Sequence, residues 1–176
     1  MTTMLIGADH RGLSAAKHLV DHLRGQGVDV RLIAPEDGSP RDYPDIAYEV
    51  ARSVATGEFP EAVLICATGV GMAIAANKVP GVRAAVVHDE LTSELSKSHN
   101  HANIVCMSAD LLGDRLMAKI VDIWRQTQKG GGRHERRVSK IGIIESGADP
   151  REAKTAEIEA KSGAAESAPK RSPDQL

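Results

Sequence analysis

Short aliphatic segments alternate with longer amphipathic segments along most of the chain. Brief runs of Val, Ile, Leu and Ala between polar or glycine-rich segments are typical of buried β-strands. Five such runs occur, at Met4–Ala8, Val28–Ile33, Ala62–Cys66, Arg83–Val87 and Ile104–Met107. The amphipathic stretches between them are about 10–15 residues long, which suits helices.

Apolar residues in the amphipathic stretches recur at the spacing of a helix face. From Leu13 to Leu23 they follow the i, i+3, i+4 pattern, which ends at Gly25. The same pattern runs from Leu116 to Trp124 after the fifth strand. This alternation predicts an α/β fold in which helices cover both faces of a five-stranded parallel sheet.

Sheets of this kind bind ligands beyond the carboxyl ends of their strands. The residues that directly follow each predicted strand are therefore the first candidates for a site. Residues 34–44 are rich in Pro, Gly, Asp and Ser and predict a loop. The candidate segments are Asp9-His10, Pro35–Tyr43, Cys66–Gly71, His88-Asp89 and Ser108–Asp110.

The composition narrows the classes of function. The chain of 176 residues contains one Trp, two Tyr and one Phe, which argues against modules that stack nucleic-acid bases on exposed rings. The net charge of −2 gives no field that would favour nucleic acid or an anionic membrane. The N-terminus does not resemble a signal peptide, and Cys66 and Cys106 are too few for a disulfide framework. We therefore expect a cytoplasmic protein with free thiols.

The composition changes near residue 147. Residues 149–176 are rich in Ala, Glu, Lys, Ser and Pro and contain almost no branched aliphatic side chains. Such a segment cannot bury enough apolar surface to offset the entropy of ordering. We expect one folded domain over residues 1–148 and a disordered polar tail over residues 149–176, with at most a short helix around residues 151–161.

The segment around Cys66 carries the strongest chemical signal. A predicted strand ends at Cys66, a glycine-rich turn follows, and an Ala-rich helix is expected to begin near Gly71. A helix N-terminus offers N–H groups and a positive dipole end to an anion, and it lowers the pKa of a thiol placed there. Cys66 is therefore a candidate thiolate base beside an anion hole. A small core cysteine at a strand end explains the residue alone equally well.

Three other phosphate-binding motifs fit this segment less well. A dinucleotide fingerprint needs a third glycine where Ile74 stands, and a P-loop needs Gly-Lys-Ser/Thr where Gly71-Met72-Ala73 stands. A cysteine phosphatase would have an arginine six residues after the cysteine, at the position of Met72. The segment thus gives no indication of a nucleotide cofactor.

Further polar groups flank the other predicted strands. Asp9-His10 follows the first strand, where the aspartate serves equally well as a helix cap. His99-Asn100-His101 precedes the fifth strand, without a Cys or carboxylate at the spacing of a metal site. Arg133 and Arg137 would share a helix face and fit a phosphate, although a solvated surface turn explains them as well. Together these groups indicate proton transfer on a phosphorylated small molecule, without cofactor or metal.

Six motifs follow one another over residues 4–145. They are Gly7-Ala8-Asp9-His10-Arg11-Gly12, Asp42-Tyr43-Pro44-Asp45, Cys66-Ala67-Thr68-Gly69-Val70-Gly71, Ala75-Ala76-Asn77-Lys78, His99-Asn100 with Asn103, and Gly131-Gly132-Arg133-His134 with Arg137. In this order they resemble the type B ribose-5-phosphate isomerases, in the family that also contains the galactose-6-phosphate isomerase subunits. Each motif alone is modest evidence, whereas six in the family's order are specific.

The resemblance implies a fold, an assembly and a reaction. The fold is a Rossmann-like three-layer α/β/α sandwich. The assembly is a homodimer, or a tetramer of two such dimers, in which each active site takes residues from both subunits. The reaction is aldose–ketose isomerisation of a sugar phosphate through a cis-enediolate, without cofactor or metal, and ribose 5-phosphate with ribulose 5-phosphate is the first substrate pair to expect.

The resemblance also implies a role for each motif. Cys66 would move the proton between C1 and C2, Thr68 would assist at the substrate oxygens, and His99 with Asp9 would open the furanose ring. One subclass carries a glutamate at the position of Met72, so this chain resembles the cysteine subclass. The implied binding residues are Gly69, Val70, Gly71, Met72 and Ala73 through their backbone amides, His10, Arg133 and Arg137 at the phosphate, and Tyr43 and Asn100 at the sugar.

Several positions depart from the family pattern. Ala73 stands where the family usually has Ser, and Asp110 stands where it has an arginine that helps to bind phosphate. The second change should weaken binding of a dianion unless Arg115 or a water molecule compensates. The departures leave open another four- to six-carbon substrate, such as an erythrulose, allose or galactose phosphate, or a non-catalytic sugar-phosphate-binding paralogue. Retention of the base and the ring-opening pair favours the enzyme.

Overall fold

The computed structural model describes residues 3–36 and 38–153. The chain divides into two compact units, the first ending at Lys129 and the second beginning at Gly130. Strands and helices alternate through the described part of the first unit. They are β1 (Thr3–Ala8), α1 (Leu13–Gly25), β2 (Asp29–Ile33), α2 (Tyr43–Ala55), β3 (Ala62–Cys66), α3 (Val70–Ala76), β4 (Ala84–Val86), α4 (Glu90–Asn100), β5 (Ile104–Ser108) and α5 (Asp114–Gln126).

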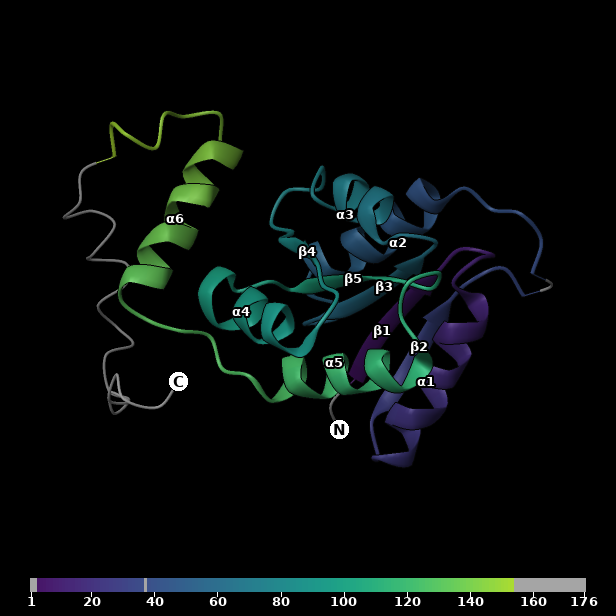
Figure 1. Cartoon of the computed structure of the whole chain (residues 1–176). Coiled ribbons are helices and arrows are strands. Elements are labelled where there is room, and N and C mark those ends of the chain that lie inside the picture. Colours follow the sequence, from purple (N-terminus) through teal and green to yellow (C-terminus); the bar gives the residue numbers. More distant parts are fainter. Residues whose placement is uncertain (1–2, 37, 154–176) are drawn as a thin grey trace, which may run out of the picture. The chain divides into compact units, whose positions relative to one another are not determined.

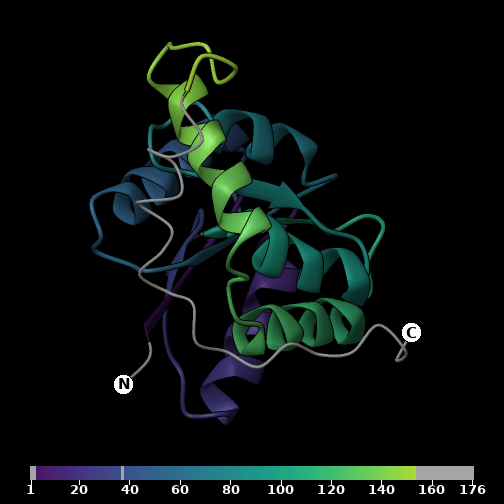
Figure 2. The same ribbon diagram turned by 90° about the vertical axis from the view of Figure 1, so that its left-hand side faces the viewer.

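The five strands form one parallel sheet in the order β2-β1-β3-β5-β4. Helices α1 and α5 cover one face, and α2 and α3 cover the other (Figure 1). Helix α4 lies beside α5 in both views (Figures 1 and 2). Connections that run toward β2 pass over one face and those that run toward β4 pass over the other, as right-handed crossovers require. This arrangement confirms the predicted α/β/α sandwich.

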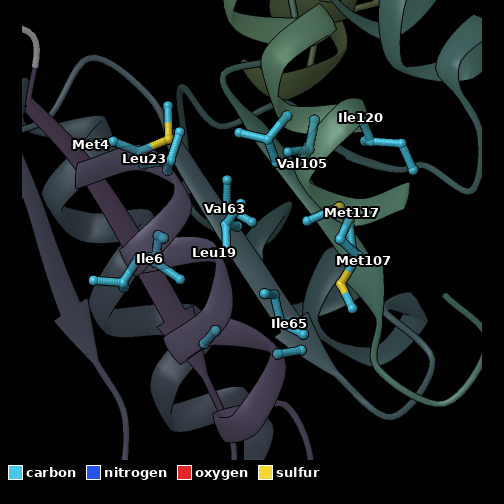
Figure 3. Close-up of a cluster of buried hydrophobic side chains, with 14 of the residues drawn as sticks. Met4, Ile6, Leu19, Leu23, Val63, Ile65, Val105, Met107, Met117 and Ile120 are labelled. Atoms are coloured by element: carbon cyan, nitrogen blue, oxygen red, sulfur yellow. The ribbon is translucent and has the colours of Figure 1, made fainter. Parts of the chain in front are cut away.

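Each face of the sheet has its own hydrophobic core. Successive residues of a strand point to opposite faces, so β3 sends Val63 and Ile65 toward α1 and α5, and Leu64 toward α2 and α3. Figure 3 shows the first of these cores, where side chains of β1, β3 and β5 meet those of α1 and α5. Because both faces of the central strands β1, β3 and β5 are buried, these strands read in the sequence as nearly continuous apolar runs.

Several boundaries differ from the predictions by one or two residues. The loop after β2 ends two residues earlier than expected, because α2 begins at Tyr43 and includes Pro44 in its first turn. A proline in the first turn of a helix removes no intrahelical hydrogen bond, so Pro44 starts the helix and does not belong to the loop. Strand β4 has three residues instead of the five predicted, and all three are only half-buried at the sheet edge.

The second unit contains α6 (Arg133–Glu145). Residues 151–153 form a turn and a bend. The rest of the predicted short helix around residues 151–161, and residues 154–176 of the tail predicted over residues 149–176, lie outside the described residues. Of the helices that the structure describes, none has both the length and the apolar character to cross a lipid bilayer.

Candidate active site

The carboxyl ends of β1, β3 and β5 lie side by side at one edge of the sheet. The chain leaves β1 and β5 toward the α1 and α5 face, whereas it leaves β3 toward the opposite face. Such a reversal opens a crevice at the strand ends, where α/β sheets bind their ligands. Three loops border this crevice: Asp9–Gly12, Ala67–Gly69 and Ala109–Gly113.

The loop after β3 folds back on the sulfur of Cys66. The backbone N–H of Gly69 donates to Sγ of Cys66 at 3.2 Å. Gly69 has φ +77°, and a Cβ there would lie 3.0 Å from the backbone carbon of Met107. Only glycine adopts this conformation readily in so little space. The Cys66 side chain is 4% exposed, so the sulfur sits in a sheltered position with an amide directed at it.

Tyr43 packs against the start of α3. A Cβ on Gly71 would lie 2.7 Å from Cε2 and Cζ of the Tyr43 ring, so the ring occupies the space that a side chain would take. The next amides along, at Gly71 and Met72, belong to the first turn of α3, where N–H groups have no intrahelical partner. The structure thus brings the predicted sugar-site tyrosine to the predicted glycine turn.

Asp9 holds the loop after β1. Its Oδ1 accepts hydrogen bonds from the backbone N–H groups of Arg11 and Gly12, both at 2.9 Å, and the side chain is 5% exposed. The carboxylate thus orders the loop backbone. It does not cap α1, whose N-cap is Gly12 without a side-chain hydrogen bond, so the helix-capping interpretation of Asp9 is wrong. A Cβ on Gly12 would lie 2.3 Å from the carbonyl oxygen of Ile65, so this loop packs directly on β3. His10 lies in the same loop and is exposed.

The end of β5 and the loop after it form hydrogen bonds with the backbone at Cys66 and Ala67. Oγ of Ser108 donates to the carbonyl oxygen of Ala67 at 2.5 Å, and the N–H groups of Ala109 and Asp110 donate to the carbonyls of Cys66 and Ala67 at 2.9 and 3.2 Å. Ser108 is fully buried. It is a positioning residue. The sequence placed it in the candidate segment Ser108–Asp110 but assigned it no role, although a hydroxyl at the end of an apolar strand was a usable signal.

His99 and Asn100 lie at the opposite edge of the sheet. They form the C-terminal end of α4, which leads into the amino end of β5 at Ile104. Ile104 pairs with Ala62, whereas Ser108 pairs with Cys66, so the two edges are about 13 Å apart at ~3.3 Å per residue. Within one chain, His99 and Asn100 are therefore not brought to Cys66 and Asp9.

Arg133 and Arg137 belong to the second unit. Helix α6 begins at Arg133, so the two arginines are one turn apart on the same helix face, as predicted. Nε of Arg133 donates to Nε2 of His134 at 3.2 Å. In the described ranges, no three His, Cys, Asp or Glu side chains come together as metal ligands.

The second cysteine and a buried lysine differ from Cys66 in their surroundings. Burial raises the pKa of Cys106 far above its usual range, and the nearby Cys66 adds to this effect, so Cys106 stays a neutral core thiol.

Lys97 is 4% exposed, pairs with Glu61, and places its ammonium 4.1 Å from the centre of the Trp124 ring. Burial, with a smaller contribution from Lys129, lowers the pKa of Lys97 to about 8.

Comparison with known proteins gives a consistent result. The family model described as Ribose/Galactose Isomerase matches residues 4–141. Ribose-5-phosphate isomerase B of Escherichia coli is 40% identical over 145 residues, which cover 82% of this chain and 97% of that protein. D-erythrulose-4-phosphate isomerase of Pectobacterium atrosepticum is 33% identical over 146 residues, which cover 82% and 96%.

A solved structure agrees with these sequence matches. Ribose-5-phosphate isomerase B of Clostridium thermocellum is similar to this chain with a TM-score of 0.81 at 40% identity, over 82% of this chain and 98% of that one. The similarity therefore covers the sheet, its helices and the loops that border the crevice. The chain belongs to the ribose/galactose isomerase family.

Proposed function

We propose that the protein is a cofactor-independent aldose–ketose isomerase that interconverts ribose 5-phosphate and ribulose 5-phosphate. The observation that carries the proposal is the sheltered Cys66 sulfur with the Gly69 amide directed at it, at the carboxyl end of the central strand β3. The relatives named as ribose-5-phosphate isomerase B, at 40% identity over nearly their full length, support the choice of substrate.

In the proposed reaction, the Cys66 thiolate removes the proton from C2 of the open-chain aldose. The electron pair left on C2 forms the C1–C2 double bond of a cis-enediolate, and the same sulfur returns the proton to C1. Thr68 exchanges protons with the two substrate oxygens. Backbone amides of the segment from Gly69 to Ala73 stabilise the enediolate charge, because donors fixed before the reaction need no reorganisation.

The first turn of α3 narrows the choice among those amides. The N–H of Gly69 already donates to Cys66, that of Val70 donates to Oγ1 of Thr68 at 3.3 Å, and that of Ala73 donates to the Gly69 carbonyl at 3.1 Å. We therefore assign the main contacts with the enediolate to the amides of Gly71 and Met72, with the Tyr43 ring beside them at the sugar.

A homodimer is part of the proposal. Ring opening needs a group that protonates the ring oxygen and a group that takes the proton of the anomeric hydroxyl, and we assign these steps to His99 and Asp9. Because His99 and Asn100 lie a strand length away from Asp9 in one chain, a second copy of the chain must supply them. In a dimer with a two-fold axis each subunit supplies His99 and Asn100 to the site of the other, so two equivalent sites form.

The phosphate end of the substrate completes the assignment. We assign phosphate binding to His10, beside Asp9, and to the Arg133 and Arg137 pair on α6. The isomerase domain then extends over residues 1–148, because α6 belongs to the catalytic machinery. We also assign the protein to the cytoplasm, where reducing conditions keep a thiol such as Cys66 free.

A second substrate is supported by one specific relationship. The relative named D-erythrulose-4-phosphate isomerase is 33% identical over 96% of its length, and Ala73 and Asp110 depart from the usual family residues. A four-carbon sugar phosphate is therefore the alternative substrate. The chemistry at C1 and C2 is the same for both, so the choice rests on the contacts beyond these atoms.

The test is proton exchange in heavy water, followed by NMR, with a panel of ribose, ribulose, erythrulose, allose and galactose phosphates. We expect exchange at C1 or C2 and turnover with the five-carbon pair. Cys66→Ala should abolish exchange while it leaves sugar-phosphate binding intact. Turnover retained in a pure Cys66→Ala protein would rule out the assigned base. Binding without exchange across the whole panel would favour a non-catalytic sugar-phosphate-binding protein.

A further inference from the structure

Arg11 and Asp110 form an ion pair at the carboxyl edge of the sheet, although they lie 99 positions apart in the sequence. Nη2 of Arg11 is 2.8 Å from both Oδ1 and Oδ2 of Asp110. The two side chains are 56% and 42% exposed. An exposed pair of this kind adds little to stability, so its place in the fold is more informative than its strength.

The pair spans the carboxyl end of β3. Arg11 follows β1 and Asp110 follows β5, and these two strands flank β3 in the sheet. The bridge therefore crosses two strand spacings, about 10 Å. Because α1 and α5 cover the same face, the pair borders the crevice on that side, whereas Tyr43 and the start of α3 border it on the other.

Backbone hydrogen bonds tie both partners to the catalytic loops. The N–H of Arg11 donates to Oδ1 of Asp9 at 2.9 Å. The N–H of Asp110 donates to the carbonyl of Ala67, the residue after Cys66, at 3.2 Å. Both partners of the ion pair are therefore held by their backbones to the loops that follow β1 and β3.

Arg11 is the only lysine or arginine in the loops that follow β1, β3 and β5. A guanidinium carries five N–H donors and no acceptor, and Asp110 engages one of its three nitrogens. In the part of the chain that the structure describes, Nε and Nη1 of Arg11 donate to no protein acceptor. Two nitrogens are thus available for a ligand that carries negatively charged oxygens.

We propose that Arg11, positioned by Asp110, binds the phosphate group of the sugar phosphate. The inference rests on the proposed function, which supplies the anionic group. Charge-assisted hydrogen bonds from a guanidinium to phosphate are among the strong ones in proteins. In the resembled family an arginine stands at position 110. In this chain Arg11 supplies the positive charge, and Asp110 orients the Arg11 side chain.

Steady-state kinetics of Arg11→Met with ribose 5-phosphate, and with inorganic phosphate as competitive inhibitor, test the proposal. We expect KM and the phosphate inhibition constant each to rise about tenfold, the loss of one charge-assisted contact, while kcat stays within about twofold. Asp110→Asn removes the charge but keeps an acceptor for Arg11, so KM should change less than in Arg11→Met. The matched control is Arg31→Met, because Arg31 is also 56% exposed and pairs with Glu58 at 3.0 Å.

Other outcomes overturn the proposal in distinguishable ways. Unchanged KM and unchanged phosphate inhibition in Arg11→Met would exclude the contact and leave the proposed function intact. A higher KM with unchanged phosphate inhibition would move the contact from the phosphate to the sugar. A lower kcat alone would make Arg11 a positioning residue for Asp9. If the wild-type protein isomerises no sugar phosphate, the proposed function fails, and calorimetric binding of inorganic phosphate to wild type and Arg11→Met then decides the role of Arg11.

Discussion

The ring of Tyr43 fills the space that a side chain on Gly71 would occupy. Gly71→Ala should therefore displace the ring, or shift the first turn of α3 together with the amides that we assign to the enediolate. We expect kcat/KM to fall at least about tenfold, because small misplacements of catalytic groups cost large factors in rate. Steady-state kinetics measure the effect.

The control for this change separates the ring from the amides. Tyr43→Ala in the Gly71→Ala background removes the clash. We expect the double variant to recover activity to the level of Tyr43→Ala alone. Equal activity of wild type and Gly71→Ala would show that the contact has no bearing on the site.

The two cysteines should differ in reactivity. Burial raises the pKa of Cys106 far above its usual range, and the thiolate is the form that reacts. We expect iodoacetamide to modify one cysteine per native chain, Cys66, with inactivation in step and protection by substrate. Mass spectrometry of the labelled peptides locates the modification. Cys106→Ala should keep its activity and label as the wild type does, and modification of Cys106 before Cys66 would contradict the assignment.

Lys97 should give the protein an unusual rise in stability at alkaline pH. Burial lowers its pKa to about 8 from the ordinary value of 10.5, so above pH 8 the folded state loses a proton that the unfolded state keeps. The free energy of unfolding then gains up to about 1.4 kcal/mol per pH unit from this group, between about pH 8 and pH 10.5. Below pH 8 Lys97 keeps its proton in both the folded and the unfolded state, so this gain in stability is absent there.

Lys97→Met isolates this effect from the other titrating groups. Thermal unfolding of both proteins at pH 7, 8, 9 and 9.5 should show the wild type gaining stability relative to the variant as pH rises. A constant difference would mean that the Glu61 carboxylate keeps the ammonium charged throughout this range, against the effect of burial. Lys119→Met is a matched control, because Lys119 pairs with Glu90 but is 64% exposed.

Two inactive variants should restore activity when their subunits are mixed. In a dimer of Cys66→Ala with His99→Asn, one site carries both defects and the other carries neither. Random exchange gives half mixed dimers, so we expect about one quarter of wild-type activity. Refolding a mixture of the two proteins and assaying isomerisation measures it. The Cys66→Ala/His99→Asn double variant, mixed with either single variant, is the control and should stay inactive, and an inactive mixture of the two single variants would contradict a shared site.

The strands β1, β3 and β5 were predictable because each is buried on both faces. Continuous apolar runs such as Ala62–Cys66 have no other common explanation at that length, and the structure has the strand at the same residues. The start of α2 was harder to predict, since Pro44 fits a loop as well as the first turn of a helix. The packing of Ile46 and Ala47 on the sheet decides for the helix.

Only the features of the site that lie within a single loop were predictable from the sequence. Gly69 and Gly71 predict a tight turn beside Cys66, and the structure has that turn. The pairing of Arg11 with Asp110 joins residues 99 positions apart, and no local pattern encodes such a contact. The sequence suggested Arg115 or a water molecule as compensation for Asp110. The structure shows Asp110 paired with Arg11, and the role of Arg11 at the phosphate is our proposal. The distance from His99 to Cys66 likewise follows from the direction of α4, which only the fold reveals.

That distance also determines how the catalyst responds to dilution. A lone chain holds Cys66, the proposed proton-transfer base, and His99, the proposed ring-opening residue, at opposite ends of the strands. Under this assignment one chain contains every required group but no complete site. Once dilution separates the subunits, the rate should follow the square of the chain concentration, and activity per milligram becomes a direct measure of assembly.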